Sequence, residues 1–105
     1  MPFTYYVYIV TNVNRNVMYV GVTNDLGKRV AEHRDGRGGT FTRQYHVHTL
    51  VYAEEYLQVD EAIAREKQIK GWRRSKKDAL VVASNPTWAD LFDVSVGKGP
   101  SLRSG

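Results

Sequence analysis

The sequence TYYVYIVTN at residues 4–12, followed by VMYVGV at residues 17–22, decides the fold of this 105-residue chain. Both stretches are rich in β-branched and aromatic residues, which are typical of β-strands. The asparagine-rich residues 12–16 between them are typical of a turn. The two strands are therefore expected to pair as an antiparallel hairpin.

Side chains along each strand alternate between the two faces of this hairpin. Val7 and Ile9 share one face of the first strand, and Met18, Val20 and Val22 share one face of the second. If these aliphatic faces lie together, the hairpin also has a second face that is rich in tyrosine. That face carries Tyr6, Tyr8, Tyr19 and Gly21.

The later elements follow from caps, loops and apolar spacing. TND at residues 23–25 is a typical helix N-cap, and DGRGGT at residues 35–40 is typical of a loop. After the hairpin we expect a helix at residues 25–34, a strand at 50–56, a helix at 60–73, and short helices at 75–83 and 87–92.

This ββαβα order, followed by short C-terminal helices, predicts an α+β fold with a three-stranded antiparallel sheet flanked by helices. One domain is expected over residues 1–93, because two cores in a chain of this length would each be too small. Residues 94–105 are rich in glycine and serine and are expected to form a disordered tail.

Composition excludes several classes of protein. No apolar run approaches the roughly 18 residues that a membrane-spanning helix needs, so we expect no membrane association. The N-terminus lacks the basic and apolar regions of a secretory signal. The chain has no cysteine, which excludes disulfides, thiolate metal ligands and thiol nucleophiles. A cytoplasmic location is therefore expected.

Positive charge is concentrated in one segment of the chain. The net charge is +4, yet residues 65–77 alone hold seven lysines and arginines and only one acidic residue. Such a basic segment beside Trp72 is typical of binding to a phosphate backbone, although it also suits a solvated helix surface. The cations expected to contact nucleic acid are Lys70, Arg73, Arg74, Lys76 and Lys77.

Five polar residues stand out as candidates for chemistry. Tyr8 and Tyr19 share a sheet face, Arg29 and His33 lie on the apolar side of their helix, and Glu66 borders the buried side of the long helix. A carboxylate can hold a hard cation such as Mg²⁺, and an arginine can pair with a phosphate. A phenol or imidazole can accept the proton of an attacking water. Together these groups would suffice for metal-assisted hydrolysis of a phosphodiester.

The same residues also have structural explanations. The tyrosines can be a cross-strand aromatic pair, and Arg29 can form an ion pair with Asp25. Glu66 can form one with Lys70, four residues later.

The spacing of these residues resembles that of the GIY-YIG nuclease superfamily. Tyr6-Val7-Tyr8 stands for the first half-motif and Tyr19-Val20-Gly21 for the second. More narrowly, the chain resembles small single-domain bacterial members, related to the N-terminal nuclease domain of an excinuclease. The resemblance covers residues 4–92, and its most specific parts are GVTNDLGKRVAEH (21–33) and AREKQIKGWRRSKKDAL (64–80).

The resemblance implies a role for individual residues. Tyr8 and Tyr19 would be the two motif tyrosines, and either of them could be the general base. Gly21 would allow close approach of substrate or backbone. Arg29 would contact the scissile phosphate, and Glu66 would bind the single metal ion, Mg²⁺ or alternatively Mn²⁺.

Two further positions and three departures complete the comparison with the superfamily. His33 stands where members have histidine or tyrosine, and Asn85 would match an asparagine that follows the metal-binding glutamate. Tyr6 replaces the glycine of the first half-motif and Val20 the isoleucine of the second. Val22 stands where excinuclease relatives often carry a lysine.

The resemblance implies a metal-dependent endonuclease that hydrolyses phosphodiester bonds in DNA, in repair, recombination or mobile-element processing, with RNA as an alternative substrate. Without an appended DNA-binding domain, we expect weak, structure-selective binding or recruitment by a protein partner. The alternative hypothesis is a nucleic-acid-binding module with little or no cleavage. An interaction adaptor is a third hypothesis, and the oligomeric state is left open.

Overall fold

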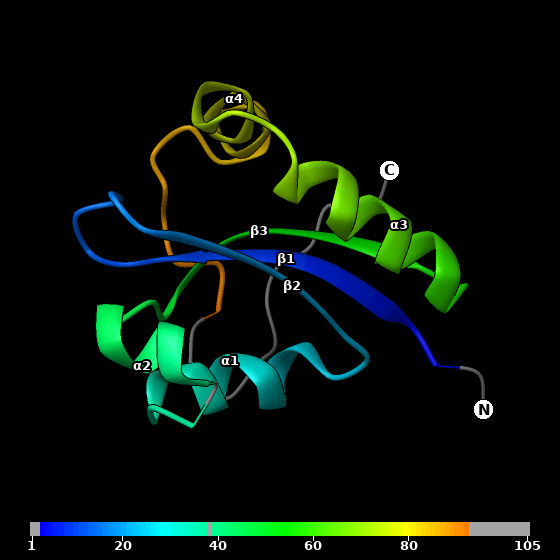
Figure 1. Cartoon of the computed structure of the whole chain (residues 1–105), viewed down its shortest axis with the longest axis horizontal. Helices are drawn as coiled ribbons and strands as arrows, with labels where there is room; N and C mark the ends of the chain where they lie inside the picture. The colour runs from blue at the N-terminus through cyan, green and yellow to red at the C-terminus, as the bar shows by residue number, and fades with distance from the viewer. Residues whose placement is uncertain (1–2, 38, 93–105) are drawn as a thin grey trace.

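The three-stranded sheet and its helices are seen in a computed structural model, which describes residues 3–37 and 39–92 (Figure 1). The strands are antiparallel and lie in the order β2-β1-β3, so the expected α+β fold is confirmed. The elements in chain order are β1 (Tyr5–Thr11), β2 (Met18–Thr23), α1 (Leu26–Arg34), α2 (Thr40–Tyr45), β3 (Thr49–Tyr56), α3 (Val59–Lys70) and α4 (Arg74–Ser84).

The β1–β2 hairpin has the two faces that the alternation predicts. Tyr8 lies opposite Gly21, and Ile9 lies opposite Val20. In the turn, the side-chain oxygen of Asn12 accepts a hydrogen bond from the backbone N–H of Val17 at 3.1 Å. The turn thereby fixes the register of the two strands.

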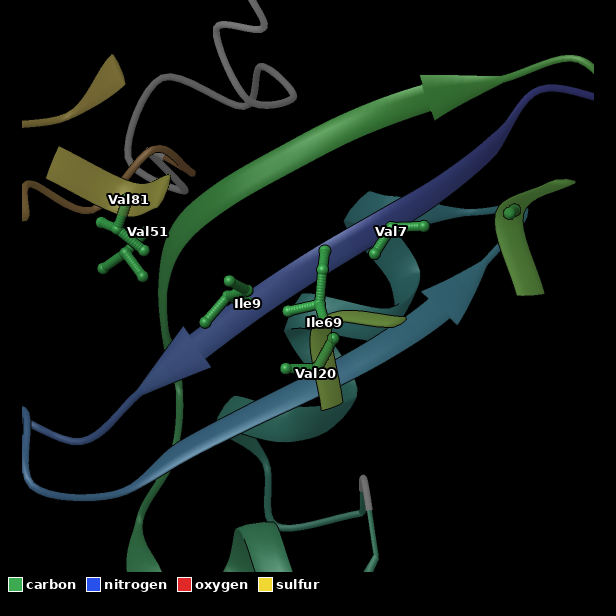
Figure 2. Close-up of a cluster of buried hydrophobic side chains, with 7 residues drawn as sticks. Val7, Ile9, Val20, Val51, Ile69 and Val81 are labelled. Carbon is green, nitrogen blue, oxygen red and sulfur yellow. The ribbon is translucent and has the colours of Figure 1, made fainter. Parts of the chain in front are cut away.

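Helices cover both faces of the sheet. On the aliphatic face, α3 and α4 pack against the strands and bury Val7, Ile9, Val20, Val51, Ala62, Ile69 and Val81 (Figure 2). On the tyrosine face, α1 packs over a second cluster that contains Tyr8, Val10, Leu26, Val30, Val47 and Leu50. The helices that follow β3 therefore cover the aliphatic face, and the helix that follows β2 covers the tyrosine face.

Two segments differ from the kind of structure expected for them. The short helix α2 (Thr40–Tyr45) begins at the end of the expected loop, where the sequence pattern predicts no helix. Residues 87–92, expected to be helical, form turns and irregular structure instead. Trp88 has φ = 58°, in the left-handed region, which a right-handed helix cannot accommodate. The expected tail at residues 94–105 lies outside the described residues.

The long helix is shorter than its apolar spacing predicts. The spacing indicates residues 60–73, but the helix ends at Lys70, with Gly71 as its C-cap. Within residues 3–37 and 39–92, no helix is long and apolar enough to cross a membrane.

A half-buried carboxylate on β3 connects the sheet to α3. Glu54 accepts hydrogen bonds from the Tyr52 hydroxyl, from the Tyr56 hydroxyl at 2.7 Å, and from Nε of Arg65 at 2.9 Å. Burial raises the pKa of Glu54, but the bonds from Arg65, Tyr52 and Tyr56 outweigh it and hold the pKa below its usual value. The charged form of Glu54 is therefore part of the folded structure.

Replacement of Glu54 by alanine should lower the free energy of unfolding by about 2 kcal/mol at pH 7, because three donors lose their acceptor. The neighbouring Glu55→Ala is the matched control: Glu55 is exposed on the other face of the strand, and its loss should change stability by less than about 0.5 kcal/mol. Urea unfolding followed by circular dichroism measures both. Equal effects of the two substitutions would contradict the role given to Glu54.

Candidate active site

Tyr8 is buried because the residue opposite it on β2 has no side chain. The Tyr8 ring crosses over Gly21, and a Cβ atom at position 21 would lie 2.5 Å from the Tyr8 hydroxyl oxygen and 2.6 Å from Cζ. Real Cβ atoms essentially never approach other atoms so closely. The close approach that glycine was expected to permit is thus made by the phenol of Tyr8 itself.

Helix α1 brings His33 to this phenol. The Tyr8 hydroxyl oxygen and Nε2 of His33 share a hydrogen bond of 2.9 Å. Both residues are almost fully buried, at 2% and 1% exposure. The inward position expected for His33 is confirmed, and Nδ1 of the same ring is buried without a hydrogen-bond partner. Tyr8 and His33 therefore form one buried polar pair within an otherwise apolar cluster.

Burial sets the protonation of this pair. It raises the pKa of Tyr8, with a further increase from Tyr19 and a partly opposing effect of the Arg29 charge. Burial also lowers the pKa of His33 to about 4, and the positive charge of Arg29 contributes in the same direction. At neutral pH Tyr8 is a neutral phenol and His33 a neutral imidazole.

Tyr19 completes a cluster of three rings. Its ring centroid lies 6.4 Å from that of Tyr8 and 5.5 Å from that of His33. Tyr19 is half-buried, whereas Tyr8 is buried. Because β2 is an edge strand of the sheet, Tyr19 lies where the cluster meets solvent.

Arg29 lies one turn before His33 on α1 and is partly exposed. Its guanidinium forms an ion pair with Glu32 at 3.5 Å, not with Asp25. Asp25 instead caps α1, since its side chain accepts a hydrogen bond from the backbone N–H of Lys28. Sequence reasoning missed Glu32, although its i+3 spacing from Arg29 was a usable signal.

Glu66 reaches the same edge from the opposite face of the sheet. Its side chain is 18% exposed and forms an ion pair with Nζ of Lys70 at 2.9 Å. The same Nζ lies 5.9 Å from the ring centroid of Tyr19. The Glu66 charge also raises the pKa of Tyr8. Helix α3 therefore supplies a carboxylate and an ammonium to the cluster that α1 covers.

The structure thus brings together the five candidates for chemistry, and adds Lys70 to them. Contacts around the edge strand β2 link two phenols, an imidazole, a carboxylate and an ammonium, and they join α1 to α3 across that edge. The charge of the Arg29 guanidinium acts on both Tyr8 and His33. Such a set can bind a phosphodiester, bind a cation and exchange protons. The members are Tyr8, Tyr19, Arg29, His33, Glu66 and Lys70.

The donor set suits a hard cation that is completed by other ligands. Residues 3–37 and 39–92 contain no group of three or more histidine, aspartate or glutamate side chains able to hold a metal. Mg²⁺ commonly takes one or two carboxylates and fills its remaining positions with water and substrate phosphate. The Glu66 carboxylate is of the type that such a site uses, and it already forms an ion pair with the Lys70 ammonium. The residues therefore fit an open Mg²⁺ or Mn²⁺ site.

The other predicted cations lie on α4 and at its start, and they differ in their surroundings. Nε of Arg74 forms an ion pair with Asp78 at 2.7 Å. Nζ of Lys76 lies 4.4 Å from the ring centroid of Trp72, which is half-buried and packs against the core. Within the described part of the chain, the members of this set with no ion pair are Arg73, Lys76 and Lys77.

Asn85 lies at the far edge of the sheet from the ring cluster. It is buried, and its side-chain amide donates hydrogen bonds to the carbonyls of Val51 on β3 and Ala89, at 3.1 and 2.9 Å. Since β3 and β2 are opposite edges, these bonds fasten the segment after α4 to the sheet. They also explain why residues 87–92 are not helical: the Asn85 side chain fixes the backbone of Ala89 instead.

Comparison with known proteins gives a consistent result. The GIY-YIG catalytic domain family matches residues 4–78. A UPF0213 protein of Natronomonas pharaonis is 36% identical over 81 residues, which cover 77% of this chain and 94% of that protein. A UPF0213 protein of Bacillus pumilus is 39% identical over 64 residues, which cover 61% of this chain and 65% of that protein.

A solved structure is also similar. The solution NMR structure of a UPF0213 protein from Bacillus halodurans superposes with a TM-score of 0.54 at 29% identity. The match covers 83% of this chain and 92% of that one.

Alanine at position 21 should destabilise the protein by about 2 kcal/mol, because its Cβ would displace the Tyr8 ring. This loss of stability should be smaller when Gly21→Ala is combined with Tyr8→Val, because the ring that the Cβ would displace is absent. Gly27→Ala in α1 is the control: its Cβ would lie 3.6 Å from Phe92, an ordinary contact, and helix propensity should raise stability slightly. Urea unfolding of the four variants measures these changes. An undiminished cost in the Tyr8→Val background would exclude the proposed clash.

Stability should fall by about 2 kcal/mol between pH 7.5 and pH 5 because of His33. In this interval the unfolded chain binds a proton at position 33 that the folded protein, with a pKa of about 4, does not. His33→Phe should lose less stability over this pH interval than wild type does, whereas His48→Gln should lose as much as wild type. The histidine ring signals in NMR provide a direct check. A His33 signal that titrates near pH 6.5 would contradict the prediction.

Proposed function

The chain belongs to the GIY-YIG catalytic domain family, and on that premise we propose that it is a metal-dependent endonuclease that hydrolyses phosphodiester bonds in DNA. One observation carries the proposal: the candidate side chains of β1, β2, α1 and α3 meet at a single edge of the sheet. A structural explanation of each residue by itself does not require that they meet.

Arg29 is the residue that we propose to bind the scissile phosphate. Its side chain is 39% exposed, and its ion pair with Glu32 at 3.5 Å is long. A phosphate accepts two parallel hydrogen bonds from a guanidinium, which is a stronger interaction than this single exposed contact. Arg29 can therefore exchange Glu32 for substrate without loss of a well-formed bond.

Tyr19 is the phenol that we propose to contact the attacking water. It is half-buried at the edge strand, whereas Tyr8 is 2% exposed. Tyr8 and His33 lie behind it as a neutral hydrogen-bonded pair, and both rings contact Tyr19. In this proposal they hold the Tyr19 ring in place, and their neutrality keeps unpaired charge out of the buried cluster.

Glu66 is the residue that we propose to hold the divalent ion that nucleases of this family typically use. When bound, such an ion supplies Lewis-acid stabilisation of the negative charge that develops on the phosphate. The Lys70 ammonium at 2.9 Å supports the assignment, because it marks Glu66 as a place where positive charge is favourable.

The α3–α4 surface is the proposed contact to the nucleic-acid backbone. Lys70 is a member of the candidate site, and Arg73 and Lys77 carry no ion pair within the described residues. Unpaired cations release the counterions of a polyanion on binding and so favour association. DNA is the proposed substrate, and RNA the alternative.

A second candidate function is a nucleic-acid-binding module that does not cleave. It is favoured by the two ion pairs Arg29–Glu32 and Glu66–Lys70, since the charges assigned to catalysis are satisfied within the protein itself.

A nicking assay on supercoiled plasmid should show cleavage with Mg²⁺ or Mn²⁺ and none with EDTA. Glu66→Gln and Arg29→Ala should each lower the rate by about 100-fold or more, as loss of charge stabilisation does. Glu61→Gln is the matched control, since Glu61 is exposed on the same helix and should not matter. Branched, single-stranded and RNA substrates test the choice of nucleic acid.

Cleavage by Glu66→Gln at the wild-type rate would overturn the site assignment. No cleavage with any metal, together with salt-dependent binding, would favour the binding module.

A further inference from the structure

Lys70 lies inside the candidate site as well as on the helix surface. Its Nζ is 2.9 Å from a carboxylate oxygen of Glu66 and 5.9 Å from the ring centroid of Tyr19. The Glu66 side chain is 18% exposed, and that of Lys70 is 49% exposed. A counterion stabilises a carboxylate that is partly withdrawn from water, and in the free protein Lys70 is that counterion.

The pairing distinguishes Lys70 from its neighbour on α3. Lys67 is exposed, lies one residue after Glu66, and has no ion pair within the described residues. Residues four apart on a helix face each other, whereas adjacent residues do not. Of these two lysines, Lys70 is therefore the one that forms an ion pair with Glu66.

A divalent ion on Glu66 would compete with this ammonium. Two cations beside one carboxylate repel each other, and more strongly where water is partly excluded. The lysine stem is flexible and half exposed, so its head group can leave without disturbing α3. The nearest strong acceptor for it in a substrate complex is a phosphate of the nucleic acid.

We propose that Lys70 exchanges its ion-pair partner during binding. In the free protein its ammonium pairs with the Glu66 carboxylate, and on binding of metal and nucleic acid it moves to a backbone phosphate. The proposal rests on the function proposed above, because it takes Glu66 as the metal ligand. Metal and nucleic acid then bind cooperatively, since a phosphate gives Lys70 a new partner and frees Glu66. By linkage, each ligand raises the affinity for the other by the same factor.

Mn²⁺ binding to the whole chain without nucleic acid tests the exchange independently of activity. The free Mn²⁺ signal in electron paramagnetic resonance gives the dissociation constant for wild type, Lys70→Met, Lys67→Met and Glu66→Gln. Lys67→Met is the matched control, because it removes the same charge from the same helix. Lys70→Met should bind Mn²⁺ about fivefold more tightly than Lys67→Met, the effect of losing one partly exposed competing ion pair.

The affinity for a labelled DNA duplex, measured by fluorescence anisotropy with and without Ca²⁺, tests the cooperativity. In wild type, Ca²⁺ should tighten binding to the duplex, and the duplex is checked on a gel to be intact. In Lys70→Met this tightening should be reduced, while in Lys67→Met it should match wild type. Circular dichroism verifies that all variants fold, and Lys70→Gln serves as a second variant.

The outcomes separate this inference from the proposed function. Equal Mn²⁺ affinity of Lys70→Met and Lys67→Met, with binding lost in Glu66→Gln, overturns the exchange and leaves the metal site in place. Wild-type Mn²⁺ affinity in Glu66→Gln overturns the metal site and the exchange with it. Failure of Lys70→Met to bind Mn²⁺ at all also overturns the exchange, which requires this variant to bind best.

Discussion

A Cβ atom at position 21 would lie 2.5 Å from the phenol oxygen of Tyr8, and this close approach of the Tyr8 ring on β1 to the backbone of Gly21 on β2 governs the candidate site. It lets a large ring lie across the neighbouring strand and reach His33 of α1 at 2.9 Å. The buried pair in turn contacts the ring of Tyr19. Without a glycine opposite Tyr8, the ring would have to leave the cluster.

The position of β2 at the edge of the sheet explains how two separate layers share one site. Helix α1 covers one face and α3 the other, so a central strand would keep their side chains apart. At the edge, Lys70 of α3 reaches the ring of Tyr19 while still paired with Glu66. The charges there are balanced in pairs, which limits the cost of removing them from water.

Much of this arrangement was predictable because it depends on local periodicity. Strand alternation assigns Tyr8, Tyr19 and Gly21 to one face, and helical spacing turns His33 toward the same core. The structure confirms these placements. The pairing register of a short hairpin and the buried side of a helix both follow from residues that are close in sequence. Both are strongly specified when one face of the element is buried.

The sequence by itself determined the α+β architecture, the two faces of the hairpin and the residue types of the site. Tertiary structure alone decided which of them meet. Asn85 matched the site by motif, yet its hydrogen bond to Val51 on β3 places it at the opposite edge. Its hydrogen bonds with Ala89 belong to the irregular structure found where a helix was expected at residues 87–92. In the sequence, Lys70 is one of several similar cations. Only the packing of α3 places its ammonium beside the ring of Tyr19. Contacts between distant segments depend on how layers pack around a shared core, which local periodicity does not encode.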